Sequence, residues 1–224
     1  MGAAIGQVLS FAVGVALSPI PIIAVVLMLA TPRGRANGPA FLLGWVVGLA
    51  AVGTIVLLLS SGAAGSDGGS PSQGNSIVSL VLGLLVLGVA LRQWRGRPAA
   101  GSEAELPKWM QTIDTFTPVK SAGIAVLLSA INPKNLLLTA GAAAAISGTG
   151  ASSGDQAVAL AVFVVIGTVG PGIPVAIYFF SSRAQELLAG LKAWMGRENA
   201  VIMTVLCLII GAKLLGSGIS GLSS

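Results

Sequence analysis

Long apolar runs separated by short polar stretches dominate the pattern of this chain. A membrane-spanning helix needs about 20 consecutive apolar residues. Six runs reach that length, near residues 4–31, 37–60, 76–94, 120–147, 155–180 and 198–218. The pattern therefore predicts an all-α integral membrane protein with six transmembrane helices.

Composition supports this interpretation and excludes an ordinary soluble domain. Of the 224 residues, 54% are hydrophobic and only 8% are charged, whereas soluble domains carry charge on about a quarter of their residues. Six spans with short connectors use nearly the whole chain, so we expect a single transmembrane domain over residues 1–224.

The basic residues predict which side of the membrane each connector occupies. Lys and Arg concentrate in the connectors after the first, third and fifth spans, and such connectors are usually cytoplasmic. With six spans, this places both termini outside the cytoplasm. We expect these charges to orient the chain and to contact anionic lipid headgroups rather than nucleic acid. They are Arg33, Arg35, Arg92, Arg95, Arg97, Lys108, Lys120, Arg183, Lys192 and Arg197.

Two segments suggest an internal repeat. ALSPIPIIAVVLML (16–29) and LLSAINPKNLLLTAG (127–141) each place a serine shortly before a proline and then a long apolar stretch. Three spans per half is an odd number, so the two halves must insert with opposite orientations. We therefore expect a 3+3 inverted repeat made of residues 1–95 and 120–224, joined by a cytoplasmic connector over 96–119.

The connector itself predicts a short interfacial helix. Leu106, Trp109, Ile113 and Phe116 recur at helical spacing. We expect Pro107 to begin this helix and the proline at 118 to end it, with the helix lying on the lipid headgroups.

Prolines predict broken helices at matching places in the two halves. Along an α-helix, Pro21 lies about 18 Å from Arg33 and Pro133 about 20 Å from Lys120, so both breaks fall near the membrane midplane. Paired interruptions of this kind indicate a transporter binding site. The alternative is that these prolines serve packing alone. A third interruption, at Pro171, Gly172 and Pro174, is a candidate hinge or gate.

Polar residues inside the apolar runs are the candidate substrate-binding residues. Lys134 leads them, since ionisable residues in spans usually face a bundle interior or a water path. Lys213 reaches a similar depth, about 22 Å from Glu198, so two cations are expected to flank one cavity that favours an anionic group. Snorkelling of the lysines to the interface is the alternative. The full set is Ser18, Pro19, Pro21, Ser129, Asn132, Pro133, Lys134, Asn135 and Lys213.

The sequence offers little for catalysis or metal binding. It has no histidine, one cysteine, Cys207, and no Cys, Asp and Glu cluster at ligand spacing. We therefore expect no enzyme activity, no catalytic residue, no metal and no cofactor. Gly44 and Gly48, four residues apart, are expected to serve helix packing within the chain rather than a dimer face, although a homo-oligomer stays open.

With these residues in view, the chain resembles the lysine exporter (LysE) superfamily, in Pro19-Ile20-Pro21, Gly34-Arg35 and Asn132-Pro133-Lys134. More narrowly, SPIPIIAVVLMLATPRGRANGPAFLLGWVVG, PKWMQTIDTFTP and INPKNLLLTAGAAAA resemble the GAP group of glycopeptidolipid-addressing and sulfolipid-addressing membrane proteins. The chain departs from the amino-acid exporters, which carry Pro-Gly-Pro in the first span. Relatives that pass electrons need two membrane cysteines, which this chain lacks.

The resemblance implies that the protein helps to export envelope glycolipids or other anionic amphiphiles across the plasma membrane. Its expected partners are membrane lipids, a lipid or glycolipid substrate and a larger lipid exporter. Two alternatives remain open: a small-solute exporter of the amino-acid type, and a non-transporting assembly subunit that docks a lipid-export machine.

Overall fold

The computed structural model describes residues 2–63, 71–96 and 108–223, and all regular structure in these ranges is helical. Leu106 and Pro107, the expected start of the connector helix, lie outside the described residues. The helices are α1 (Gly2–Ala16), α2 (Pro19–Leu29), α3 (Gly34–Ala63), α4 (Pro71–Arg95), the 3-10 helix η1 (Lys108–Thr115), α5 (Pro118–Ala130), α6 (Pro133–Ser147), α7 (Ser153–Phe180) and α8 (Ala184–Ser223).

Four helices, α3, α4, α7 and α8, are long and apolar enough to cross a membrane alone. The pairs α1–α2 and α5–α6 reach that length only together, and they bend by 51° and 62° at their breaks. Counting each bent pair as one span gives up to six within the described residues. The protein is therefore a multi-pass membrane protein. The second break falls before Pro133, as predicted, whereas the first falls before Pro19, and Pro21 lies inside α2.

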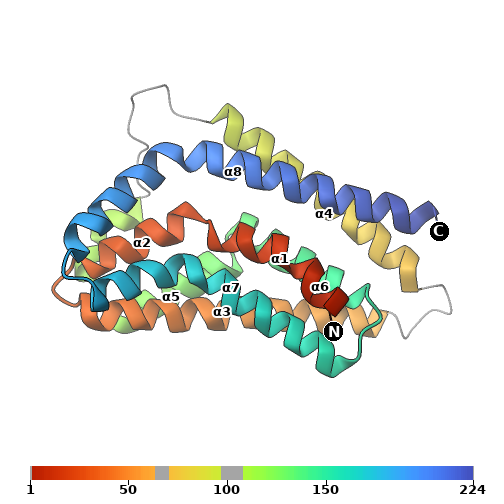
Figure 1. The fold of residues 1–224 in the computed structure, drawn as a ribbon, viewed down its shortest axis with the longest axis horizontal. Coiled ribbons are helices and arrows are strands. Elements are labelled where there is room, and N and C mark those ends of the chain that lie inside the picture. The colour runs from red at the N-terminus through yellow and green to blue at the C-terminus, as the bar shows by residue number, and fades with distance from the viewer. Residues whose placement is uncertain (1, 64–70, 97–107, 224) are drawn as a thin grey trace.

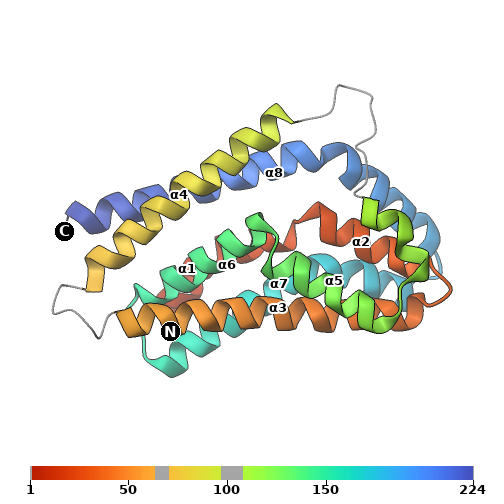
Figure 2. The same ribbon diagram turned by 180° about the vertical axis from the view of Figure 1, so that it is seen from behind.

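The helices form two groups. α4 and α8 cross each other along one side of the molecule, and α1, α2, α3, α5, α6 and α7 pack together on the other (Figures 1 and 2). The N- and C-terminal ends of the described chain lie at one end, together with the turn between α6 and α7. The α2–α3 and α7–α8 turns lie at the opposite end. The arginines of these two turns thus share one end of the molecule.

Small residues let the broken pairs approach the long helices closely. A Cβ atom at Gly170 of α7 would overlap the carbonyl oxygen of Ala16, the last residue of α1. Likewise, Gly44 of α3 lies against the backbone of Ala122, and Gly48 lies against the hydroxyl of Ser129, both in α5. These glycines therefore serve packing within the chain, as expected for small residues in membrane helices.

A buried tryptophan ties α3 to α7. Trp45 is 0% exposed, and its Nε1 donates to the carbonyl oxygen of Gly167 at 3.2 Å. Its ring stacks on Phe41, with the ring centroids 6.2 Å apart. The indole N–H of a buried tryptophan needs such a partner, so this contact fixes the two long helices beside the broken pairs.

The connector helix differs from its predicted form. It is a 3-10 helix that ends at Thr115, and Pro118 begins α5 instead of ending the connector helix. Ile113 is 4% exposed and belongs to the core, while Asn37 Nδ2 of α3 donates to the carbonyl oxygen of Phe116 at 3.1 Å. Of the apolar residues that the spacing singles out, Ile113 and Phe116 thus pack on the bundle.

Candidate binding cavity between the broken helices

The two breaks arise from the same local chemistry. Proline lacks a backbone N–H and suits the first turn of a helix, while the residue before it is forced out of the helical region. Pro19 and Pro133 are the first residues of α2 and α6, and Ser18 and Asn132 precede them. Each break therefore produces a new helix N-terminus, whose partial charge is positive.

Lys134 of α6 lies where the two breaks meet. Its side chain is 8% exposed, and its Nζ donates to the carbonyl oxygen of Gly14 at 2.7 Å and to Ser18 Oγ at 2.7 Å. Gly14 belongs to the last turn of α1, where a helix leaves carbonyl oxygens without a partner. Lys134 thus satisfies a freed carbonyl of the other half, but both of these acceptors are uncharged.

Asn135 joins the same network. Ser18 Oγ donates to Asn135 Oδ1 at 2.9 Å, and Asn135 Nδ2 donates to the carbonyl oxygen of Leu128 in α5 at 3.0 Å. Since Asn135 is 0% exposed, its role is to connect α2, α5 and α6. Two consecutive residues of α6 therefore satisfy backbone groups freed at both breaks.

A cavity of about 40 Å³ opens beside this network. A site that holds one water needs about 10–15 Å³, so this space fits a few waters or a small anion, but not a sugar. Its lining comes from α6 and from three other helices: Ser18, Pro19, Ile20, Pro21, Gln93, Asn132, Lys134 and Met203. Gln93 of α4 and Met203 of α8 were not predicted from the sequence.

The structure sorts the predicted substrate-binding residues into two groups. Ser18, Pro19, Pro21, Asn132 and Lys134 line this cavity, whereas Ser129, Pro133 and Asn135 do not.

The hydroxyl of Ser129 donates to the carbonyl oxygen of Val126 at 3.1 Å and lies against Gly48 of α3. Ser129 therefore packs between α5 and α3 next to the second break and does not face the cavity.

The predicted hinge lies inside a continuous helix. Pro171, Gly172 and Pro174 belong to α7, which runs unbroken from Ser153 to Phe180. The neighbouring Gly170 contacts Ala16, at the first break. The segment thus packs beside that break, and a gating role for it stays a prediction.

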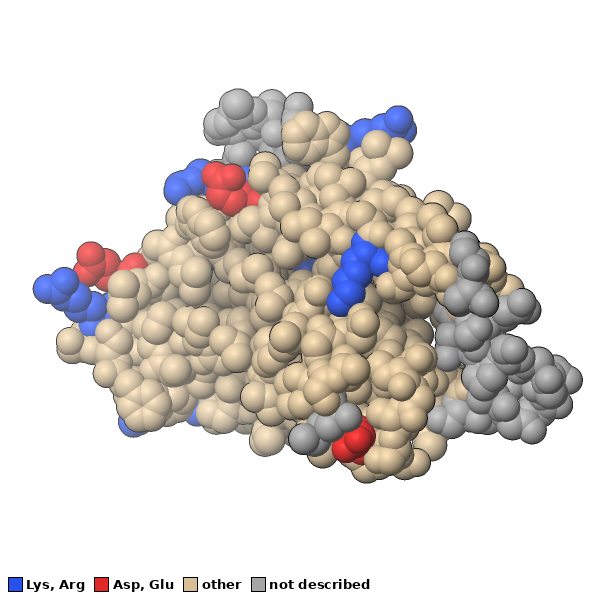
Figure 3. Space-filling model, turned by 45° about the vertical axis from the view of Figure 1, so that its right-hand side comes forward, with Lys and Arg blue, Asp and Glu red and all other residues tan. Residues whose placement is uncertain are grey.

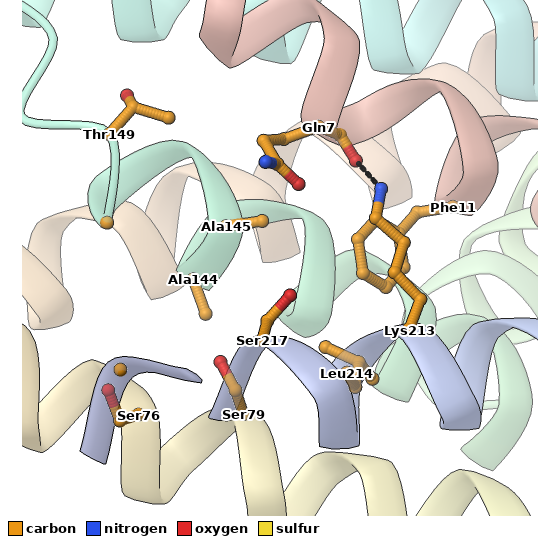
Figure 4. Close-up of a pocket in the computed structure, with 12 residues that line it drawn as sticks. Gln7, Phe11, Ser76, Ser79, Ala144, Ala145, Thr149, Lys213, Leu214 and Ser217 are labelled. Atoms are coloured by element: carbon orange, nitrogen blue, oxygen red, sulfur yellow. Dashed lines mark hydrogen bonds between the residues drawn. The ribbon is translucent and has the colours of Figure 1, made fainter. Parts of the chain in front are cut away.

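Lys213 lines a different cavity, so the two lysines do not flank a single space. This second cavity, of about 220 Å³, lies between α1, α4, α6 and α8 (Figure 4). Lys213 Nζ donates to the carbonyl oxygen of Gln7 at 2.9 Å and to Ser10 Oγ at 3.2 Å. Sequence spacing places both lysines at similar depth, but the direction of each side chain depends on its neighbouring helices.

Charged side chains are sparse on the face that Figure 3 shows. Uncharged residues cover most of it, most of the blue and red side chains gather at one end, a blue patch interrupts the middle, and other charged side chains lie at the edges of the view. Within the described residues, no group of three or more His, Cys, Asp or Glu could hold a metal ion. The chemistry available at the first cavity is therefore that of a cation, amides and hydroxyls.

Comparison with known proteins gives one match. Residues 8–220 match the family model described as Sap, sulfolipid-1-addressing protein. None of the curated proteins or solved structures compared with the chain matches it. Because the family model covers nearly the whole sequence, including both broken pairs and the lysine between them, this chain belongs to the sulfolipid-1-addressing protein family.

Proposed function

We propose that this protein moves the polar headgroup of an anionic glycolipid across the plasma membrane and has no enzymatic activity. The observation that carries the proposal is the amine of Lys134, buried among uncharged acceptors where the α2 and α6 N-termini meet. A buried cation without a counter-ion is costly to maintain. An anionic headgroup would compensate that charge, and the two helix N-termini would add to the attraction.

The family name supports the choice of cargo. Its members are described as addressing a sulfolipid, and a sulfate ester carries the negative charge that this cavity favours. The cavity of about 40 Å³ is too small for a sugar, so we infer that this conformation is closed and that loading requires α4 and α8 to move away from Lys134. The acyl tails would remain in the bilayer while the headgroup passes.

The packing fits the 3+3 inverted repeat that the sequence predicts. In such a repeat, α1 of the first half is equivalent to α5 of the second, and α3 is equivalent to α7. The contact of α1 with Gly170 of α7 then has its counterpart in the contact of α5 with Gly48 of α3. We propose that the halves rock against each other to give alternating access. Both termini would face away from the cytoplasm, and a larger lipid exporter would accept the cargo.

The test uses purified protein in vesicles that contain a fluorescent glycolipid with a sulfated sugar. Transfer of its headgroup between leaflets should depend on the protein and should fall about tenfold or more in Lys134→Gln, since a hydrogen bond to a charged group contributes roughly 1.5–3 kcal/mol. Gln retains a donor for the Gly14 carbonyl but loses the charge. The matched control is Lys192→Gln, which removes a lysine of α8 that lines neither cavity.

Each rival function predicts a different result. Protein-dependent movement of labelled amino acids without lipid transfer would indicate a small-solute exporter. A non-transporting assembly subunit would leave cellular lipid export intact in Lys134→Gln, while charge reversal at Arg92, Arg95 and Arg97 would abolish it. Either result would overturn the proposal.

A further inference from the structure

The cavity around Lys213 has the chemistry of a headgroup site. Its volume is about 220 Å³, over five times that of the cavity beside Lys134. Figure 4 shows Ser79 of α4 and Ser217 of α8 pointing into the same space, with Gln7 of α1 across from them. The apolar part of the lining comes from Phe11, Ala144, Ala145 and Leu214. Hydroxyls and amides that converge beside an apolar surface are typical of small-molecule sites.

Lys213 reaches from α8 to α1 beside this cavity. Besides its two hydrogen bonds to α1, its Nζ lies 5.3 Å from the centre of the Phe11 ring. These partners are a carbonyl, a hydroxyl and an aromatic face, and none carries a formal charge. The amine is thus tied to α1 at a partly exposed side of the cavity, and its charge stays available to a ligand.

The two cavities lie in series along one seam between α4–α8 and the other helices. Both contain residues of α4 and α8. Their lysines bond to carbonyls of the same helix, at Gln7 and Gly14, which are about 10 Å apart along α1. The second cavity includes Thr149 of the α6–α7 turn, so it lies toward the end of the molecule that holds both termini.

An apolar plug separates the two cavities. A Cβ atom at Gly14 would meet Ile210 Cδ1 at 2.6 Å and Leu138 Cδ1 at 3.0 Å, and one at Gly141 would meet the ring of Phe11 at 2.9 Å. Phe11, Leu138 and Ile210 are each at most 1% exposed. Close packing of large side chains on glycine leaves no path for a polar headgroup unless α8 moves.

We propose that the Lys213 cavity is a second binding site for an anionic sugar headgroup, on the side of the plug away from the cytoplasm. This inference rests on the proposed function. Lys213 binds the anionic group, while Gln7, Ser79 and Ser217 bind the sugar hydroxyls. The headgroup occupies the Lys134 site first and reaches this one when the plug opens, so the protein has a loading site and a release site.

The experiment measures protection of a reporter cysteine in each cavity. In a Cys207→Ala background, Ser217→Cys reports on the second cavity and Gln93→Cys on the first. The probe is an octyl glycoside that carries a sulfate, and the same glycoside without sulfate is the control. At a probe concentration ten times the Kd, the rate of maleimide modification at the occupied site should fall about tenfold.

Charge variants then separate the two sites. Lys213→Gln should abolish protection at position 217 and leave protection at position 93, whereas Lys134→Gln should do the reverse. Lys213→Arg keeps the charge and should preserve protection at 217, which distinguishes loss of binding from misfolding.

Protection at 93 alone would overturn this inference and leave the proposed function standing. Absence of protection at both positions would overturn both proposals. Equal protection by the uncharged glycoside would overturn the role assigned to the cation.

Discussion

The two breaks are alike in origin but differ in how they are stabilised. In the second break Asn132 caps its own helix, since its Oδ1 accepts from the backbone N–H of Lys134 at 3.1 Å. In the first break, Ser18 occupies the N-cap position of α2 without a side-chain capping bond. Its hydroxyl instead contacts Lys134 and Asn135 of the other half.

The two breaks also differ in how they pack against the neighbouring long helix. The first rests on a backbone contact, between Gly170 and the carbonyl of Ala16, whereas the second rests on the side chain of Ser129 against Gly48. A side chain can adjust or be removed, but a helix backbone cannot move without its neighbours. The first break therefore depends more on the rest of the molecule, and four substitutions test this difference.

Gly170→Ala should have the largest effect. The new methyl would overlap a backbone oxygen at the first break, so we expect a loss of more than about 3 kcal/mol, the upper part of the range for overpacking. Gly172→Ala is the matched control, because a Cβ there meets nothing within 4 Å. The control should gain roughly 0.5–1 kcal/mol from helix propensity. Thermal unfolding in detergent measures both, and equal stability of the two variants would contradict the contact.

Gly48→Ala should destabilise the second break less, by about 1–3 kcal/mol. The obstacle is the hydroxyl of Ser129, so Ser129→Ala in the same chain should restore part of the lost stability. A double-mutant cycle of unfolding midpoints measures this coupling. Additive effects of the two substitutions would show that the hydroxyl is not the obstacle.

Ser18→Ala should lower the free energy of unfolding by roughly 1–2 kcal/mol. The substitution removes the hydroxyl that accepts from Lys134 and donates to Asn135 inside the bundle. Ser18→Thr keeps the hydroxyl and should retain more of this stability. The unfolding midpoints of the two variants decide the point. If Ala and Thr behave alike, the hydroxyl does not tie the halves together.

Asn132→Ala should have the smallest effect, about 1 kcal/mol, which is typical for loss of an N-cap. Asn132→Asp preserves the cap and should lie close to the unsubstituted protein in unfolding midpoint. A loss in Asn132→Ala larger than that in Ser18→Ala would reverse the ranking of the two breaks.

Proline placement and apolar length sufficed to predict the broken pairs. Pro19 and Pro133 act through their own rings, so their effect is local and visible in the sequence. The connector was predicted less well: Ile113 and Phe116 have helical spacing, but their packing on the bundle and the 3-10 form depend on helices distant in sequence.

The lining of each cavity was harder to predict for the same reason. Gln93 and Met203 reach the first cavity only because α4 and α8 lie over the breaks. Gln93 is an uncharged polar residue between Arg92 and Arg95 at the end of an apolar run, and that is the signal that could have identified it. The sequence predicts freed carbonyls before Pro19, but not that Lys134 bonds to that of Gly14, because this contact depends on how α6 packs beside α1.

The amine of Lys134 has one more consequence. An ammonium group has three protons, and two of them bond to Gly14 and Ser18 across the boundary between the halves. One N–H of the ammonium group is left for an anion. An anion that accepts more than this one hydrogen bond must displace a bond that joins the two halves. Under the proposed function, binding of the anionic headgroup and loosening of the contact between the halves would be one event, so Lys134 would disfavour movement of the halves without cargo.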